Sequence, residues 1–294
     1  MSLRLAVATE DFGSHFKRSI AKAAKLAVEG VRLNARSELD VLKATDSALR
    51  QILLYVTERQ MNVAGLSCPT KHALYEQEFL EPRLEIIRKS MSLVGKLQTK
   101  ELIVRCGSIP DSADNGSDAA ESKTIDPADP FGFAAAATNA KPSPAKEFST
   151  LCEILNDLAA YGNHVGCVLQ LQLTDFNVDR IQQLLNAVTT GPLSIVFDPA
   201  TAVMTGADEN ERYRTLHNSI GYVRARDAVR NVDGAGTEVA VGSGVVDWVT
   251  LLPTLIEADY HGWVCVERTG GDSRAEDVKR GITALSQLMP QTGS

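Results

Sequence analysis

Eight short apolar runs, each followed by a longer amphipathic segment, recur along the 294 residues of this chain. Runs of this length predict buried strands, and the segments between them have the apolar spacing of helices. Eight strand–helix units in succession predict an α/β fold, a closed (β/α)8 barrel formed by 1–294 as a single domain. The alternative is a doubly wound sheet, which normally has a glycine-rich first turn that TEDFGSH (9–15) does not supply. The eight predicted strands are 4–10, 30–36, 62–67, 101–107, 166–174, 193–198, 221–227 and 263–271.

Two segments interrupt this alternation. Residues 107–146 are rich in Ser, Asp, Ala, Pro and Gly and have almost no apolar periodicity. Because the alternation resumes after them, they predict an insertion after the fourth strand and not a linker between domains; the insertion is either a lid on the active face or a disordered loop. Residues 228–246 predict a glycine-rich loop after the seventh strand. The helix predicted over 16–30 is expected to end at Gly30, since glycine is common at helix C-caps.

Composition excludes several classes of protein. The net charge of −7 and a pI of about 5.3 leave no basic footprint for nucleic acid. No run approaches the roughly 18 apolar residues of a membrane span, and no export signal is visible, so we expect a cytoplasmic protein with no membrane partner. The five cysteines are odd in number and widely spaced, which fits a reducing compartment better than disulfides or a zinc site.

Strand parity brings polar side chains into the barrel near the carboxyl ends of the strands. Charges buried there must pair with one another or with a bound molecule. A ring of internal ion pairs with a purely structural role is one interpretation, and a ligand site is the other. Arg32 and Gln170 lie deeper along their strands and are expected to be structural. The polar residues expected at the mouth are Glu10, Asn34, Arg105, Gln172, Asp198, Arg224, Arg226 and Glu267.

The chain resembles a known family in its eight runs and in four short motifs. These are FDPA (197–200), RARD (224–227), GSGVVDW (242–248) and VERTGGD (266–272). Together they resemble the xylose-isomerase-like TIM barrels over almost the whole chain apart from 107–146. That family contains sugar and sugar-phosphate isomerases and epimerases as well as DNA-repair enzymes of the endonuclease IV type. The DNA-repair function is disfavoured, because it would need a histidine-rich zinc site and a basic surface.

The resemblance implies a divalent metal held by Glu, Asp, His and Glu at the ends of the fifth to eighth strands. In this chain those positions are Gln172, Asp198, Arg224 and Glu267. An amide oxygen can bind a hard cation, but arginine stays protonated and has only donors. No cofactor is therefore firmly expected. If Mn²⁺, Mg²⁺ or Zn²⁺ were bound, its ligands would be Asp198, Glu267 and Gln172; otherwise arginine replaces the metal as the counter-charge.

Two functions remain open from the sequence. In the first, the protein is a sugar or sugar-phosphate isomerase or epimerase with Glu267 as the proton-transfer group, Asp198 orienting the substrate and Arg224 stabilising an oxyanion. Glu10 is then the candidate for the second base, which Gln172 cannot supply. In the second, the chain is a non-catalytic metabolite-binding or structural member of the family. The partner is a sugar acid or sugar phosphate, and a homo-oligomer is left open. The residues expected to contact the ligand are Arg105, Gln172, Arg226, Asn34, Glu10 and Arg268.

Overall fold

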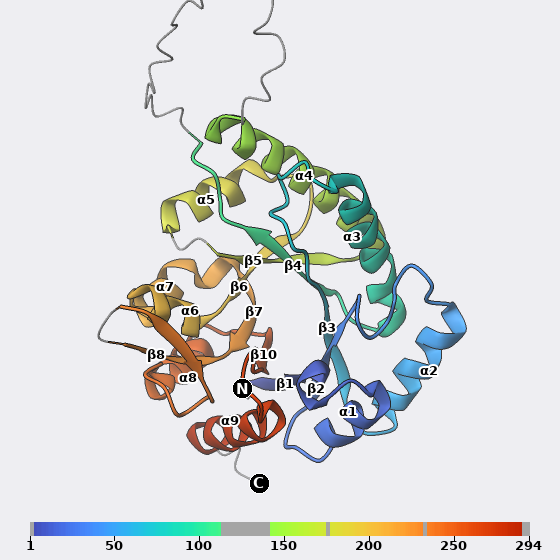
Figure 1. Cartoon of the computed structure of the whole chain (residues 1–294), viewed down its shortest axis with the longest axis vertical. Coiled ribbons are helices and arrows are strands. Elements are labelled where there is room, and N and C mark those ends of the chain that lie inside the picture. Colours follow the sequence, from blue (N-terminus) through green and yellow to red (C-terminus); the bar gives the residue numbers. More distant parts are fainter. Residues whose placement is uncertain (1–2, 113–141, 175–176, 232–233, 290–294) are drawn as a thin grey trace, which may run out of the picture.

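Eight parallel strands close into a barrel in the computed structural model of the chain, which describes residues 3–112, 142–174, 177–231 and 234–289 (Figure 1). Around the ring the order is β1-β10-β7-β6-β5-β4-β3-β2, so the first and last barrel strands pair and the predicted closed barrel is confirmed. The barrel strands are β1 (Arg4–Ala8), β2 (Gly30–Asn34), β3 (Asn62–Cys68), β4 (Glu101–Gly107), β5 (Val168–Leu173), β6 (Leu193–Phe197), β7 (Ile220–Ala225) and β10 (Trp263–Val266).

Helices surround this ring on the outside, and several begin at a residue whose side chain accepts a hydrogen bond from the first turn (Figure 1). Asp198 and Asp247 are two such N-caps. No helix in the described part of the chain is long and apolar enough to cross a membrane. The α-helices are α1 (Phe16–Ala23), α2 (Asp46–Thr57), α3 (Leu80–Val94), α4 (Pro144–Val165), α5 (Val178–Ala187), α6 (Pro199–Thr205), α7 (Glu209–Leu216), α8 (Trp248–Glu257) and α9 (Arg274–Leu288), and the short 3-10 turns are η1 (Thr9–Phe12), η2 (Gly95–Leu97) and η4 (His217–Ser219).

The apolar core has two parts, as strand parity predicts. Alternate strand positions such as Val7, Leu169 and Ile195 face outward and pack in the layer between strands and helices. The other positions fill the barrel interior, where the buried cluster consists of Ala6, Ala64, Ile103, Val196, Tyr222, Trp263 and Cys265. This interior cluster fills the barrel below the polar residues of the mouth.

Gly30 does not cap the first helix, contrary to the prediction. Helix α1 ends at Ala23, and Gly30 begins β2. A Cβ atom at Gly30 would lie 2.8 Å from a ring carbon of Trp263, so the absence of a side chain allows that indole to fill the lower barrel. The glycine is thus required by close packing and not by a helix end.

The region after β7 also differs from its prediction. Residues 228–246 were expected to be a loop, but β8 (Asp227–Arg230) and β9 (Gly236–Val239) pair as an antiparallel ribbon beside α6 (Figure 1). The insertion predicted over 107–146 does fall between β4 and α4. Residues 113–141 lie outside the described part, so its role as a lid or a disordered loop stays a prediction.

Candidate functional site at the barrel mouth

Glu267 follows β10 and forms ion pairs with two arginines, Arg224 of the adjacent strand β7 and Arg32 of β2, which lies beyond β1. Arg224 donates from Nε and Nη2 to its two carboxylate oxygens, each over 2.9 Å. Arg32 donates from Nη1 to the same two oxygens over 3.2 and 3.0 Å. Burial would raise the pKa of Glu267, but the charges of Arg224 and Arg32 outweigh it and lower that pKa to about 2. Glu267 is therefore ionised, buried and fully engaged as an acceptor.

Asp198 is the second acid of this cluster. It caps α6, and its Oδ2 lies 2.7 Å from Nη1 of Arg226 and 3.5 Å from Nη1 of Arg224. Arg224 thus bridges Asp198 and Glu267. Burial tends to lower the pKa of Arg224, whereas Glu267 and Asp198 raise it, and the net direction is upward. All three side chains are at most 9% exposed, so solvent screens these pairs little.

Arg32 also connects this cluster to the first strand–helix unit. Its Nη2 lies 2.7 Å from Oε1 of Glu10, and the Nδ2 of Asn34 donates to Oε2 of Glu10 over 2.6 Å. Arg32 was expected to lie deeper and to be structural; its side chain extends to the mouth and contacts two candidate site residues, and its structural role stays a prediction. Gln170, in contrast, donates to Glu101 at the start of β4, away from the mouth. Glu10 lies in the 3-10 turn η1 and not in β1, yet it still faces the mouth, with its side chain 34% exposed.

Three acidic residues that were not predicted from the sequence, Glu238, Asp277 and Asp11, surround Arg268. Glu238 of β9 lies 3.1 Å from Nε of Arg226 and 3.2 Å from Nη1 of Arg268. Arg268 also contacts Asp277 of α9 over 3.0 Å, so its guanidinium is engaged within the protein. Asp11 accepts a hydrogen bond from the Arg268 N–H over 3.0 Å, and burial is the main reason that its pKa is raised to about 7. Only the antiparallel ribbon brings Glu238 back to the mouth, and no motif in the glycine-rich segment signals it.

A cavity of about 510 Å³ opens above these ion pairs. Four arginines and one carboxylate are among the described residues that line it. Arg105, which sequence parity places here, is exposed and has no carboxylate within 4 Å in the described chain. Gln172 lines this cavity and a smaller one of about 200 Å³ that also contacts Asp198 and Arg226. The lining of the larger cavity includes Glu10, Arg32, Asn34, Ser67, Thr70, Arg105, Gln172, Thr174, Arg224 and Arg274.

The donor set at the four implied metal positions does not fit a divalent ion. Arg224 lies within 3.5 Å of both carboxylates and would repel a cation placed between them. Both oxygens of Glu267 already accept two guanidinium N–H groups each. Among the residues that the structure describes, no group of three or more His, Cys, Asp or Glu side chains is arranged to hold a metal.

Comparisons with known proteins agree with this architecture. A family model described as xylose isomerase-like TIM barrel matches residues 20–288. An inosose dehydratase from Geobacillus kaustophilus (strain HTA426) is 27% identical over 133 residues, which cover 40% of this chain and 41% of that protein. The chain thus matches about two fifths of the length of this curated relative.

Solved structures show the same fold. A xylose isomerase domain protein from Planctomyces limnophilus has a TM-score of 0.77 at 18% identity, covering 98% of both chains. The 3-keto-D-glucoside 4-epimerase from E. coli has a TM-score of 0.71 at 11% identity, covering 97% of this chain and 99% of that one. A xylose isomerase-like barrel from Mycobacterium smegmatis, solved in complex with magnesium, has a TM-score of 0.70 at 13% identity, covering 98% and 96%. At these identities the likeness establishes the fold alone.

Proposed function

Because the chain belongs to the xylose isomerase-like TIM barrel family, we propose that its barrel mouth binds a small anionic polyhydroxy compound, a sugar acid or a sugar phosphate, without a divalent ion. The double ion pair of Glu267 with Arg32 and Arg224 is the observation that carries this proposal. A bound cation would supply the counter-charge for the strand-end carboxylates, and here the guanidinium groups supply it. Breaking these buried pairs to admit an ion would leave charges without partners, which is costly.

The excess of arginine in the cavity lining supports an anionic ligand. Arg105 has no carboxylate partner among the residues that the structure describes, and it can make the bidentate contact that guanidinium groups form with a carboxylate or a phosphate. Asn34, Gln172 and Thr174 line the same cavity and provide donors and acceptors for hydroxyl groups. A volume of about 510 Å³ suits a small metabolite.

Glu267 is poorly suited to proton transfer in this arrangement. A general base works best when its pKa lies near the working pH, and the pKa of Glu267 is about 2. Its four hydrogen bonds from guanidinium groups also leave little room for a substrate proton. The proposal therefore assigns binding and charge neutralisation to the Arg32–Glu267–Arg224 unit.

A second candidate function, proton transfer by Glu10, is favoured by one specific observation. Among the described residues that line the cavity of about 510 Å³, Glu10 is the one carboxylate, and its side chain is 34% exposed. It could remove a proton from a carbon next to a carbonyl while Arg105 or Arg224 stabilises the oxyanion. The E. coli structural relative is a 3-keto-D-glucoside 4-epimerase, which fits the same reaction class.

Calorimetric titration tests the binding proposal. Gluconate and glucose 6-phosphate are the probes, and neutral glucose is the control ligand. We expect an anionic probe to bind one site per chain, and Arg105→Gln to weaken it by about tenfold or more, since a charge-assisted hydrogen bond contributes about 1.5–3 kcal/mol. Arg18→Gln, which removes one exposed charge from α1 away from the cavity, should change the affinity less than twofold. Equal effects of the two variants would contradict the assignment of Arg105.

The metal and the reaction are tested separately. We expect elemental analysis to find much less than one divalent ion per chain and added Mn²⁺ to leave the Tm unchanged; one tightly held ion per chain would overturn the metal-free proposal. Incubating probe sugars with the protein in D₂O, followed by NMR, tests proton transfer. Deuterium incorporation that disappears in Glu10→Gln would establish the second candidate, whereas binding without incorporation supports a purely binding role.

A further inference from the structure

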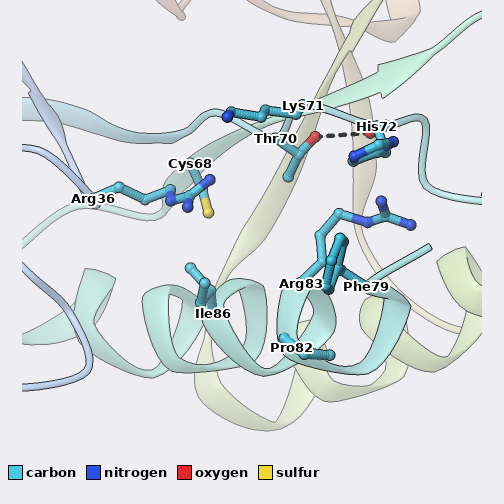
Figure 2. A pocket seen from close by; sticks show the side chains of 9 residues that line it. All are labelled: Arg36, Cys68, Thr70, Lys71, His72, Phe79, Pro82, Arg83 and Ile86. Carbon is cyan, nitrogen blue, oxygen red and sulfur yellow. Dashed lines mark hydrogen bonds between the residues drawn. The ribbon is translucent and has the colours of Figure 1, made fainter.

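A second cavity, of about 400 Å³, lies beside the mouth between the loop after β3 and helix α3 (Figure 2). Cys68 and Thr70 line both cavities, so the two are neighbours on the face where the strands end. Of the nine described residues that line this second cavity, four are basic and none is acidic. The chain as a whole has a net charge of −7, so this local excess of positive charge is unusual for it. The four basic residues are Arg36, Lys71, His72 and Arg83.

Arg83 is a buried cation without a carboxylate partner. It is 7% exposed, and its guanidinium donates to the backbone carbonyls of Glu76 and of Glu78. Its Nε has no hydrogen-bond partner in the described chain, and no described carboxylate lies within 4 Å of it. Figure 2 shows the side chain extending from α3 toward His72 on the opposite loop. The Glu76 carboxylate acts on Arg83 only at longer range, and burial outweighs it and lowers the pKa of Arg83, so the guanidinium has no carboxylate in direct contact, as such buried groups normally do.

Two further cations that line this cavity also form no ion pair with a described residue. Lys71 forms no ion pair with a described residue, and Arg36 donates only to the carbonyl oxygen of Pro69 over 3.1 Å. His72 differs, because its Nδ1 lies 2.9 Å from a carboxylate oxygen of Glu76. Three positive side chains from the β2, β3 and α3 regions therefore line one cavity, with Arg36 and Lys71 on the Cys68 side and Arg83 on the His72 side (Figure 2). An anionic group in this cavity would be attracted by all three, and a guanidinium can give it a charge-assisted hydrogen bond.

The same cavity has an apolar side. Phe79, Pro82 and Ile86 line it along α3. Phe79 is 68% exposed and has a φ of 52°, a left-handed conformation that phenylalanine rarely adopts. The exposed ring therefore offers an apolar surface at the rim of the cavity against which a bound molecule could pack.

We propose that this cavity binds an anion with an apolar body, an aryl or short acyl group that carries a carboxylate or a phosphate. The anionic group contacts Arg83 and Lys71, and the apolar body packs against Phe79 and Ile86. The site is separate from the mouth and does not depend on the function proposed for it.

Calorimetry with phenyl phosphate and benzoate tests the site and distinguishes the two anionic groups. Inorganic phosphate lacks the apolar body, and benzyl alcohol lacks the charge. We expect one of the two aryl anions to bind at least tenfold more tightly than either of these fragments. No detectable binding of both aryl anions, or equal binding of benzyl alcohol, would overturn the proposal.

Single substitutions test whether the anion binds in this cavity. Arg83→Met should weaken binding of the aryl anion at least tenfold, and Lys71→Gln and Phe79→Ala should each weaken it severalfold. Lys71 and Phe79 are exposed, so these two variants still test the site if Arg83→Met does not fold. Lys89→Gln is the matched control, because it removes a charge from α3 outside this cavity. It should leave affinity within twofold. A loss in Lys89→Gln equal to that in Lys71→Gln, or a loss in Arg105→Gln at the mouth with none in Lys71→Gln, would reject this site.

Discussion

At the scale of single residues, the mouth depends on how one carboxylate, Glu267, is shared by two arginines. A buried ion pair contributes little net stability compared with an apolar pair, because both charges lose their hydration. Removing one member is different, since its partners remain charged and buried. Removing the Glu10 carboxylate should cost less, because its side chain is 34% exposed and water can screen its charge.

We therefore expect Glu267→Gln to lower the free energy of unfolding by about 3–5 kcal/mol, because it leaves Arg32 and Arg224 without their main counter-charge. Glu10→Gln should cost about 1 kcal/mol or less. Urea denaturation at pH 7 measures both values. Similar losses in the two variants would show that Arg32 and Arg224 are neutralised by something other than Glu267.

Residue positions at the mouth were predictable where strand parity governs them. Asp198, Arg224 and Glu267 follow apolar runs at fixed positions, and the structure brings all three together. The contacts of Arg32 were not predicted, because parity gives the direction of a side chain and not how far it extends. The long arginine side chain extends from β2 to the level of the mouth, and only the position of its acceptor decides where it ends.

At the scale of elements, the β8–β9 ribbon could not be predicted from the sequence. Its strands have four residues each, too few for alternation to be recognised, and glycines surround them. Glu238 reaches the mouth because β9 pairs back along β8, a contact that no local pattern encodes. Barrel strands are different, since each one is marked by its own apolar run and its own following helix.

Asp227 fixes the position of residues 242–246, the segment after this ribbon, through hydrogen bonds. The carboxylate is fully buried and accepts hydrogen bonds from the backbone N–H groups of Ala228, Gly242, Gly244 and Val246. We expect Asp227→Ala to lower the free energy of unfolding by about 3–5 kcal/mol, because several buried donors lose their acceptor.

Asp247→Ala is the matched comparison for this prediction, since Asp247 caps α8 by accepting one hydrogen bond from the N–H of Thr250. It should cost about 1 kcal/mol. Chemical denaturation of both variants, with the Tm as a second readout, separates the two. A cost for Asp227→Ala no greater than that of Asp247→Ala would show that water replaces the lost acceptor.

Close packing of β2 against the barrel interior gives a further prediction. Gly30→Ala places a Cβ within 3 Å of the Trp263 ring, and the resulting overlap should cost about 1–3 kcal/mol and shift the tryptophan fluorescence. Gly95→Ala is the control, because no atom lies within 4 Å of its Cβ position and its φ of −61° suits alanine. It should be neutral or slightly stabilising. Equal stability of both variants would mean that Trp263 can move away without cost.

At the scale of the whole molecule, the barrel was predictable because eight local signals repeat, whereas the charge arrangement at its mouth is a global property. The acids and bases of that arrangement come from both ends of the chain, as Glu10 and Glu267 illustrate. The parallel pairing of β1 with β10 brings these ends together. Closure of the ring therefore brings together the charges that neutralise one another at the mouth, and these charges should influence how stability responds to pH.

Two groups of this mouth should act in opposite directions on that response. The pKa of Glu267 is lowered to about 2 from 4.5, so its stabilisation is complete above about pH 4.5 and is lost as the pH falls toward 2. The pKa of Asp11 is raised from 3.8 to about 7, mainly by burial, so the stability of its protonated form is complete below pH 3.8 and is lost as the pH rises through 7. The two contributions together favour a stability maximum near pH 4–5.

We expect Asp11→Asn to flatten the decline between pH 4 and pH 7, because asparagine stays neutral in the same buried position. The difference in unfolding free energy between variant and wild type should shift in favour of the variant by up to about 4 kcal/mol over this range, from about 1.4 kcal/mol per pKa unit. Asp272→Asn is the control, since Asp272 is exposed on the approach to α9, and it should keep the wild-type slope. Urea denaturation at half-unit pH steps measures all three proteins. A wild-type stability that rises steadily from pH 4 to pH 7, or an unchanged slope in Asp11→Asn, would mean that Asp11 is ionised in the folded barrel and is neutralised by Arg274, which lies 3.5 Å away.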